Sequence, residues 1–158
     1  MTLLLVDDQI NVINGLMNGI NYRKLEIDTV LPSTSVQEAK TLICENQIDI
    51  LMTDIEMPGE NGLSLLKWTQ DQGMEVECIF LTAHADFVYA RTAMQLGSFD
   101  YILQPVRYEE VEAVLRKAEG KIRENQSVRQ LQNTRKLVVE QRDTILEAIC
   151  MKLRQGRE

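Results

Sequence analysis

Short apolar runs alternate with helical segments along the first hundred residues, and this alternation constrains the fold more than any other feature. The segments between the runs carry apolar residues at helical spacing, as Val12, Ile13 and Leu16 do, and Ser35 with Glu38 predicts a capped helix start. The runs themselves are apolar almost throughout, which is typical of strands buried on both faces of a parallel sheet. The five predicted strands are Leu3–Val6, Ile27–Leu31, Ile48–Thr53, Cys78–Thr82 and Tyr101–Leu103.

This succession of elements predicts a doubly wound α/β fold of the flavodoxin-like type. Right-handed crossovers leave few arrangements for five parallel strands, and the common strand order is 2-1-3-4-5. Beyond Val106 the sequence changes to one long helical run without proline. We therefore expect one domain over residues 1–119 and an extended C-terminal helix that continues as a linker or coiled-coil segment over residues 120–158.

Three aspartates follow the ends of two predicted strands: Asp7 and Asp8 follow the first, and Asp54 follows the third. Any one of them alone is typical of a helix or turn cap. However, the carboxyl ends of parallel strands meet at one edge of a sheet, so the three carboxylates should crowd together. At about 5 Å and an effective dielectric of about 20, each pair repels by about 3 kcal/mol. A hard cation relieves this repulsion, and Mg²⁺ suits a cage of carboxylate, carbonyl and water oxygens.

The charge is divided unevenly along the chain. Residues 1–106 carry five basic and fifteen acidic side chains, a net charge of −10. Residues 107–158 carry twelve basic and nine acidic side chains, a net charge of +3. A body this acidic repels a phosphate backbone, and the tail is only mildly basic. This segment is therefore not expected to bind nucleic acid by itself.

The sequence shows no mark of a membrane or exported protein. No stretch approaches the roughly eighteen apolar residues of a membrane span, and Met1 leads directly into a strand-like run instead of a signal peptide. Cys44, Cys78 and Cys150 have neither paired nor metal-binding spacing, so we expect buried, reduced thiols. These features predict a cytoplasmic protein.

Four short motifs stand at the expected strand ends. They are Leu5-Val6-Asp7-Asp8, then Thr53-Asp54-Ile55-Glu56-Met57-Pro58-Gly59 with Gly62 after it, then Phe80-Leu81-Thr82-Ala83, and Gly97-Ser98-Phe99-Asp100-Tyr101-Ile102-Leu103-Gln104-Pro105-Val106. In this order they resemble the receiver domains of bacterial two-component response regulators, over residues 3 to about 118. No glycine-rich nucleotide-binding motif is present to favour a nucleotide fold instead.

The resemblance implies a phosphoacceptor switch that takes its phosphoryl group from a sensor histidine kinase, and not an enzyme. By position, Asp54 matches the phosphoacceptor. Asp8, Asp54 and the main-chain carbonyl of Glu56 match the ligands of Mg²⁺, and Asp7 matches the acid that acts through a coordinated water. A hydrolase with Asp54 as nucleophile is an alternative, but it would need a general acid, for which the sequence offers only His84.

Other positions match the parts of the family that couple phosphorylation to the protein surface. Thr82 resembles the hydroxyl that reaches the phosphoryl oxygen, and Tyr101 resembles the aromatic that swings inward behind it. The alternatives are a buried strand-end hydroxyl and a half-buried core aromatic. His84 matches a variable control point for dephosphorylation, for which a solvated loop histidine is the alternative. Pro105 matches a proline that follows a cis peptide bond.

Gln104 departs from the family pattern, which usually has lysine at this position. A charged hydrogen bond is worth roughly 1.5 to 3 kcal/mol against about 1 kcal/mol for a neutral one, so the site loses stabilisation and a positive charge. Either phosphorylation persists with slower transfer or weaker coupling, or the domain is a pseudo-receiver or dimerisation module that signals without phosphate. Retention of every expected oxygen ligand of Mg²⁺ favours the first.

The C-terminal helix carries a weak heptad pattern. Leu131, Val138 and Ile145 occupy one core position, and the other holds Val128, Arg135, Arg142 and Ile149. This seam predicts a homodimer contact, and a solvated linker helix is the alternative. Residues 80–106 are most similar to regulators that join a receiver to an arabinose-regulator-type helix-turn-helix DNA-binding module. That module is absent from these residues, so transcription regulation is implied only for a longer protein.

Overall fold

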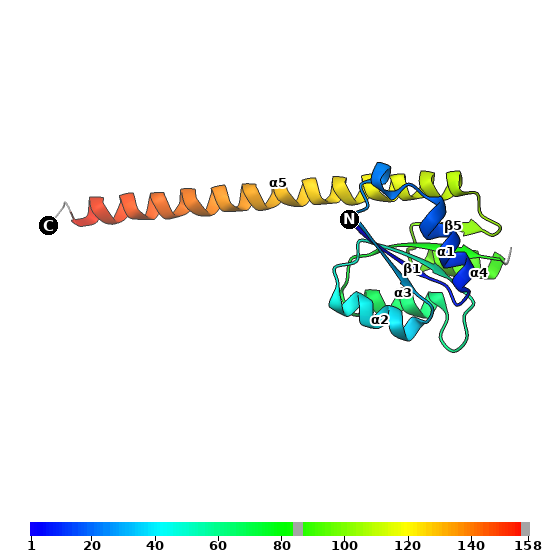
Figure 1. The fold of residues 1–158 in the computed structure, drawn as a ribbon. Coiled ribbons are helices and arrows are strands. Elements are labelled where there is room, and N and C mark those ends of the chain that lie inside the picture. Colours follow the sequence, from blue (N-terminus) through cyan, green and yellow to red (C-terminus); the bar gives the residue numbers. More distant parts are fainter. Residues whose placement is uncertain (84–86, 156–158) are drawn as a thin grey trace. The chain divides into compact units, whose positions relative to one another are not determined.

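The sheet has the strand order that the sequence predicts. The computed structural model describes residues 1–83 and 87–155, in which five parallel strands lie in the order β2-β1-β3-β4-β5 (Figure 1). The strands are β1 (Thr2–Val6), β2 (Thr29–Ser33), β3 (Ile50–Asp54), β4 (Glu77–Thr82) and β5 (Asp100–Leu103). The helices are α1 (Ile10–Gly19), the short 3₁₀ helix η1 (Tyr22–Leu25), α2 (Val36–Glu45), α3 (Gly62–Asp71), α4 (Phe87–Gln95) and α5 (Tyr108–Gln155).

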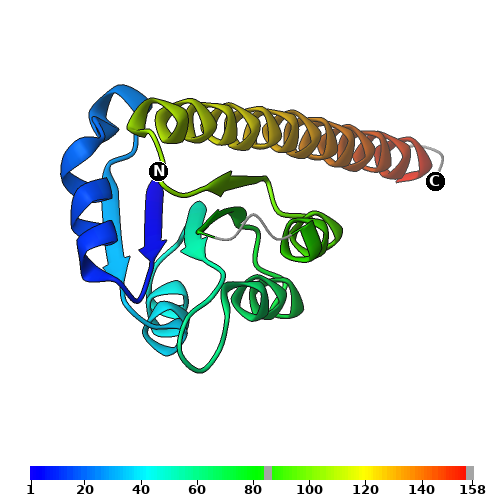
Figure 2. The same ribbon diagram turned by 90° about the vertical axis from the view of Figure 1, so that its right-hand side faces the viewer.

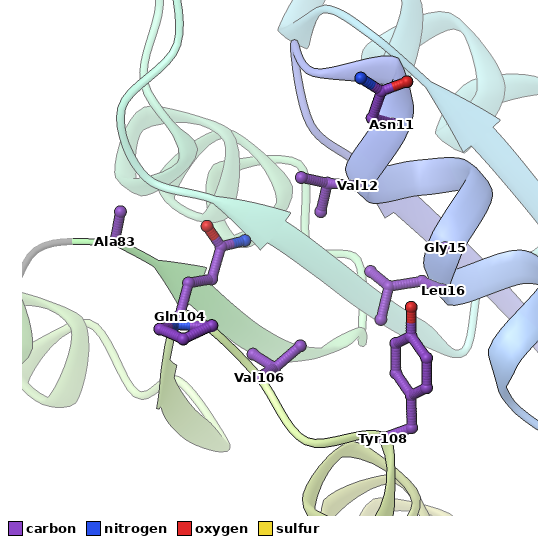
Figure 3. A pocket seen from close by; sticks show the side chains of 9 residues that line it. Asn11, Val12, Gly15, Leu16, Ala83, Gln104, Val106 and Tyr108 are labelled. Carbon is purple, nitrogen blue, oxygen red and sulfur yellow. The ribbon is translucent and has the colours of Figure 1, made fainter.

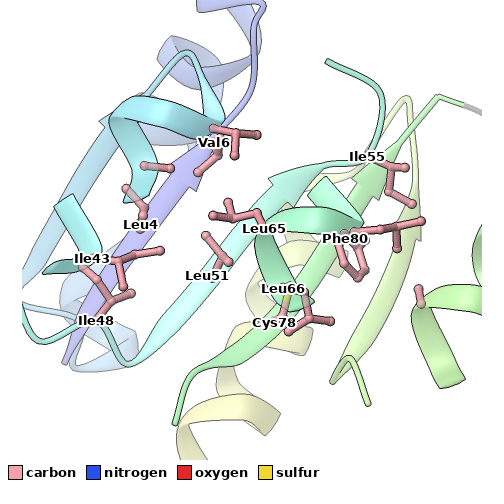
Figure 4. Packing of buried hydrophobic residues seen from close by; sticks show 14 residues of the cluster. Leu4, Val6, Ile43, Ile48, Leu51, Ile55, Leu65, Leu66, Cys78 and Phe80 are labelled. Carbon is pink, nitrogen blue, oxygen red and sulfur yellow. The ribbon is translucent and has the colours of Figure 1, made fainter. Parts of the chain in front are cut away.

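Helices cover both faces of this sheet, as expected for apolar strands. On one face, Leu4, Leu51 and Phe80 of three strands pack with Ile43 of α2 and Leu66 of α3 (Figure 4). On the opposite face lie α1 and the first turns of α5 (Figure 2). The buried residues of these two helices are Ile13, Leu16, Val111, Val114, Leu115 and Ala118. Since successive strand residues point to opposite faces, the strands contribute to both halves of the core.

Strands β2 and β3 each begin two residues later than predicted, β3 at Ile50 instead of Ile48. β2 begins at Thr29, two residues after Ile27, and it continues through Pro32. Ile27 is buried but belongs to the turn after η1, where its N–H donates to the carbonyl oxygen of Tyr22 at 3.1 Å. Proline is tolerated here because β2 is an edge strand, whose outer side needs no ladder donor.

Side-chain caps begin the two helices that follow β2 and β3. The Ser35 Oγ accepts the Glu38 N–H at 3.1 Å, which confirms the predicted start of α2. The Asn61 Oδ1 accepts the Ser64 N–H at 2.8 Å at the start of α3. Each cap satisfies a backbone donor that has no partner within its helix, and it fixes where the chain turns after the strand end.

The prediction of three buried cysteines is wrong for two of them. Cys78 of β4 is buried, but Cys44 and Cys150 are exposed, and all three are free thiols. Cys44 directly follows the buried Ile43 on α2, and one residue along a helix rotates the side chain by about 100° away from the core. The buried residue next to Cys44 therefore does not imply that Cys44 itself is buried.

The chain divides into two compact units, Met1–Gly120 and a helical unit that begins at Lys121, and α5 contributes to both. In the second unit nine of the large apolar side chains that the structure describes are exposed to solvent. They are Val128, Leu131, Leu137, Val138, Val139, Ile145, Leu146, Ile149 and Met151. Across the described ranges, α5 included, we find no helix with the length and apolar character needed to cross a membrane.

Candidate functional site

The three aspartates singled out from the sequence come together at one edge of the sheet. Asp7 and Asp8 directly follow β1, Asp54 ends β3, and these two strands are neighbours. One carboxylate oxygen of each residue lies within 4.8 Å of those of the other two. Asp7 is buried, Asp54 is half-buried and Asp8 is exposed, so the cluster opens toward solvent at one side.

Backbone donors hold the two less exposed carboxylates in place. The Ile55 N–H donates to Asp54 Oδ1 at 2.7 Å, and the Gln9 N–H donates to Asp7 Oδ1 at 2.8 Å. The N–H of Glu56 also donates to the Asp54 carboxylate. These donors stabilise the ionised form of each acid.

Burial and mutual repulsion nevertheless make the charged cluster costly. Burial raises the pKa of Asp54 to about 6, and the charges of Asp7 and Asp8 act in the same direction. Burial likewise raises the pKa of Asp7, and the neighbouring Asp8 adds to this effect. Three oxygen donors of this kind, partly desolvated and open on one side, fit a hard divalent cation such as Mg²⁺. A bound cation would favour the ionised form of all three acids.

Thr82 lies at the same edge, at the end of β4. Its side chain is completely buried, and its carbonyl oxygen accepts the Gln104 N–H at 2.7 Å. In the pairing of β3 with β4, Asp54 lies opposite Leu81, so Thr82 is one residue beyond the level of the aspartate. Tyr101 of β5 pairs with Phe80 of β4 and is half-buried against the core. The structure thus places Thr82 at the strand ends and Tyr101 two residues behind them.

Gln104 lies next to the acidic cluster. Its side-chain amide hydrogen-bonds to the Asp7 carboxylate, which partly offsets the rise in the pKa of Asp7. The peptide bond between Gln104 and Pro105 is cis, as the resemblance to receiver domains implied. Gln104 therefore contacts the acids by a neutral hydrogen bond, at the position where the family pattern has an ammonium group.

Gly62 is a part of the site whose role was not evident from its place in the second motif. A Cβ atom on Gly62 would lie 2.1 Å from the carbonyl oxygen of Asp54, which is too close for any other residue. Its N–H donates to the carbonyl oxygen of Ile55 at 2.8 Å, which closes the loop from β3 onto α3. The available signal was its place immediately after the capping residue Asn61. Close approach of two backbones is a common reason for glycine.

His84, which the sequence suggested as a control point, lies outside the described residues.

Comparison with known proteins agrees with this geometry. The family model "Response regulator receiver domain" matches residues 3–116. A response regulatory protein of Staphylococcus epidermidis is 31% identical over 112 residues, which cover 71% of this chain and 44% of that protein. The transcriptional regulatory protein HptR of Staphylococcus aureus is 30% identical over 124 residues, which cover 78% of this chain and 48% of that protein. The chain thus spans about half the length of these two relatives.

A solved structure shows the same fold. The REC domain of AraT, a response regulator from Geobacillus stearothermophilus, is similar with a TM-score of 0.73 and 26% sequence identity. The similarity covers 79% of this chain and 97% of the AraT domain.

The raised pKa of Asp54 leads to a pH-dependent prediction. A carboxyl group with a raised pKa in the folded protein destabilises the fold once it must ionise there. For Asp54, the free energy of unfolding therefore falls as the pH rises from the ordinary pKa of 3.8 to the raised pKa of about 6. Asp54→Asn should therefore be more stable than the wild type in EDTA at about pH 7.5, by about 1 kcal/mol after allowance for partial exposure. This gain should shrink below about pH 5, where Asp54 is protonated.

Thermal unfolding across pH measures this gain in stability, with the exposed Asp71→Asn as the matched control. A gain that grows as pH falls would contradict the prediction.

Proposed function

Because the chain belongs to the family of response regulator receiver domains, we propose that Asp54 accepts a phosphoryl group from a sensor histidine kinase and acts as a signalling switch. The observation that carries this proposal is the convergence of Asp7, Asp8 and Asp54 within 4.8 Å at the ends of β1 and β3. The receiver is the phosphorylated partner of a two-component pair, so it works inside the cell where its kinase domain acts.

We propose that Mg²⁺ binds this cluster. Asp8, Asp54 and the main-chain carbonyl of Glu56 would hold the ion directly, and Asp7 would act through a water. When bound, the ion neutralises charge on the incoming phosphoryl group and on the acids around it. Asp54 is suited to this role because the backbone donors of Ile55 and Glu56 orient its carboxylate while one side of the cluster stays open.

In the transfer itself, a carboxylate oxygen of Asp54 forms a bond to phosphorus while the phosphorus–nitrogen bond of the donor phosphohistidine breaks. The electron pair of that bond returns to the imidazole ring, so no oxidant or further reactant is needed. We propose that the protein is the acceptor in this reaction and not an enzyme that turns over a separate substrate. Turnover of a small phosphorylated substrate would support the hydrolase alternative instead.

Thr82 and Tyr101 are proposed to relay the change. Thr82 is fully buried at the end of β4, so its hydroxyl is positioned by the strand and not by solvent. Tyr101 is only half-buried and packs against the core from the neighbouring strand, so an inward movement of its ring would bury more of its surface. Movement of Thr82 toward a phosphoryl oxygen would open space for that ring.

The second candidate is a pseudo-receiver, and Gln104 is the observation that favours it. A neutral amide contacts Asp7 where a lysine would balance the negative charge of the cluster. We favour phosphorylation because the three acids remain close enough to share one cation.

The output of the switch is proposed to be transcription. The relative HptR of Staphylococcus aureus is a transcriptional regulatory protein about twice as long as the matched segment. We infer that in a longer protein the receiver controls a helix-turn-helix DNA-binding module. Segment 1–106 itself is too acidic to bind nucleic acid.

The helical unit from Lys121 onward is proposed to form a homodimer. Leu131, Val138 and Ile145 lie seven residues apart, and their side chains are 57 to 62% exposed. Such a repeat places one apolar stripe along a helix, and pairing with the same stripe of a second copy would remove it from water. Arg135 and Arg142 in the seam predict a weak, concentration-dependent dimer.

Phosphorylation is tested with a small donor such as phosphoramidate in the presence of Mg²⁺. Intact-mass spectrometry should show the addition of one phosphoryl group to the wild type and none to Asp54→Ala. EDTA should abolish the addition, because the acids then lack their neutralising ion. The exposed Asp71→Ala serves as the matched control and should be phosphorylated normally. Absence of an acyl phosphate on Asp54 would leave the pseudo-receiver as the better reading.

Replacement of Gln104 by lysine measures how much the missing positive charge slows phosphorylation of Asp54. Gln104→Lys should speed phosphorylation of Asp54 by about fivefold or more, since a charged hydrogen bond exceeds a neutral one by about 1 kcal/mol. Gln95→Lys adds the same charge at an exposed position of α4 and should leave the rate unchanged. Equal rates for all three proteins, measured as loss of the unmodified mass with time, would show that Gln104 does not limit transfer.

Dimerisation is tested by sedimentation velocity over a range of concentrations. The wild type should pass from monomer to dimer as concentration rises, and Ile145→Glu should remain monomeric because it places a charge in the seam. Leu137→Glu is the matched control: its side chain is 60% exposed, as is that of Ile145, but it lies outside the seam. A Leu137→Glu protein that loses the dimer while Ile145→Glu keeps it would refute the proposed stripe.

A further inference from the structure

A cavity of about 380 Å³ lies between α1 and the segment that leads from β5 into α5 (Figure 3). Val12 and Leu16 of α1 form one wall, and Val106 and Tyr108 line the other side. Small-molecule sites are typically about 300 to 1,000 Å³ in volume, mostly apolar, with a few polar groups that fix orientation. This groove has that size and that kind of lining.

Tyr108 is held in the groove by two glycines of α1. A Cβ atom on Gly15 would lie 2.7 Å from the Tyr108 hydroxyl oxygen, and a Cβ atom on Gly19 would lie 2.3 Å from its ring. The two glycines are four residues apart and therefore lie on one face of the helix. Their missing side chains let the ring lie against α1 while 39% of Tyr108 remains exposed. An aromatic surface is thus available to a ligand at this end.

The other end of the groove is polar and borders the acidic cluster. Gln104 and Asn11 contribute their side-chain amides to the lining, and Figure 3 shows the Gln104 amide pointing into the space between β5 and α1. The same Gln104 side chain hydrogen-bonds to Asp7. It does so through its N–H, because a carboxylate only accepts, so its carbonyl oxygen remains an acceptor for a ligand.

We propose that this groove binds a small primary amine with an aromatic or branched apolar body. An ammonium group donates three hydrogen bonds and accepts none, which suits the carbonyl oxygen that Gln104 retains when its N–H bonds to Asp7. The carboxylates of Asp7, Asp8 and Asp54 behind Gln104 attract its positive charge and repel a carboxylate or a phosphate. The apolar body contacts Val12, Leu16 and the ring of Tyr108.

Phenethylamine is the probe that tests this proposal, with neutral 2-phenylethanol and anionic phenylacetate as matched analogues. Each is titrated into the isotope-labelled full chain, and backbone amide shifts are followed. Saturable shifts confined to residues 11–16 and 104–108 are expected for the amine, with a Kd in the region of millimolar and about fivefold below that of the alcohol. Phenylacetate should not bind. Shifts elsewhere only, no saturation, or equal affinity of amine and alcohol would overturn the proposal.

Substitutions in the groove test where phenethylamine binds, and this test does not depend on whether Asp54 is phosphorylated. Val12→Phe and Val106→Phe each fill the groove from one side and should weaken phenethylamine binding about tenfold or more. Val88→Phe makes the same change at an exposed position of α4 outside the groove and should bind as the wild type does. Gln104→Leu should reduce the preference for the amine over the alcohol, and the charge of the three aspartates should account for what remains. Undiminished binding by both filling variants, or a preference that Gln104→Leu leaves unchanged, would contradict the assignment.

Discussion

The crowding of three carboxylates at the ends of β1 and β3 is the interaction on which the rest of the structure depends. Parallel pairing of these strands forces Asp7 and Asp8 toward Asp54, and burial keeps water from screening them fully. In the absence of a cation the cluster holds negative charge at a cost, which is visible in the raised pKa of Asp54. That stored repulsion makes the edge of the sheet receptive to a divalent ion.

The surrounding backbone is arranged to keep this crowding in one geometry. The N–H groups of Gln9 and Ile55 fix the carboxylates of Asp7 and Asp54. Gly62 lets the start of α3 approach the carbonyl oxygen of Asp54 more closely than a side chain would allow. The Asn61 cap then begins α3 at that point. Rigid elements thus position the acids, and solvent reaches them from the open side at Asp8.

Gln104 connects this cluster with a second feature of the same surface. Its side-chain amide hydrogen-bonds to Asp7, and the same side chain lines the groove between α1 and the start of α5. In most receivers a lysine balances charge at this position, so replacement by a neutral residue leaves the negative potential uncompensated there. We therefore propose that the same substitution weakens support for a phosphoryl group and leaves a groove whose polar end favours a cation.

The sequence alone determined the order of the strands and the meeting of Asp7, Asp8 and Asp54, because these follow from local apolar patterns and from strand ends that share one edge. The cis bond before Pro105 was implied only by the resemblance to receiver domains. The sequence did not determine the exact range of β2, which depends on the place of this strand at the edge of the sheet. Nor did it determine the exposure of Cys44, which depends on how α2 is rotated about its axis against the core. Only the tertiary structure decided that Gly62 touches the Asp54 backbone and that Tyr108 lies on Gly15 and Gly19. These contacts join residues up to ninety-three positions apart in the chain. They depend on how whole elements pack together, and the pattern of residues within one element does not reveal them.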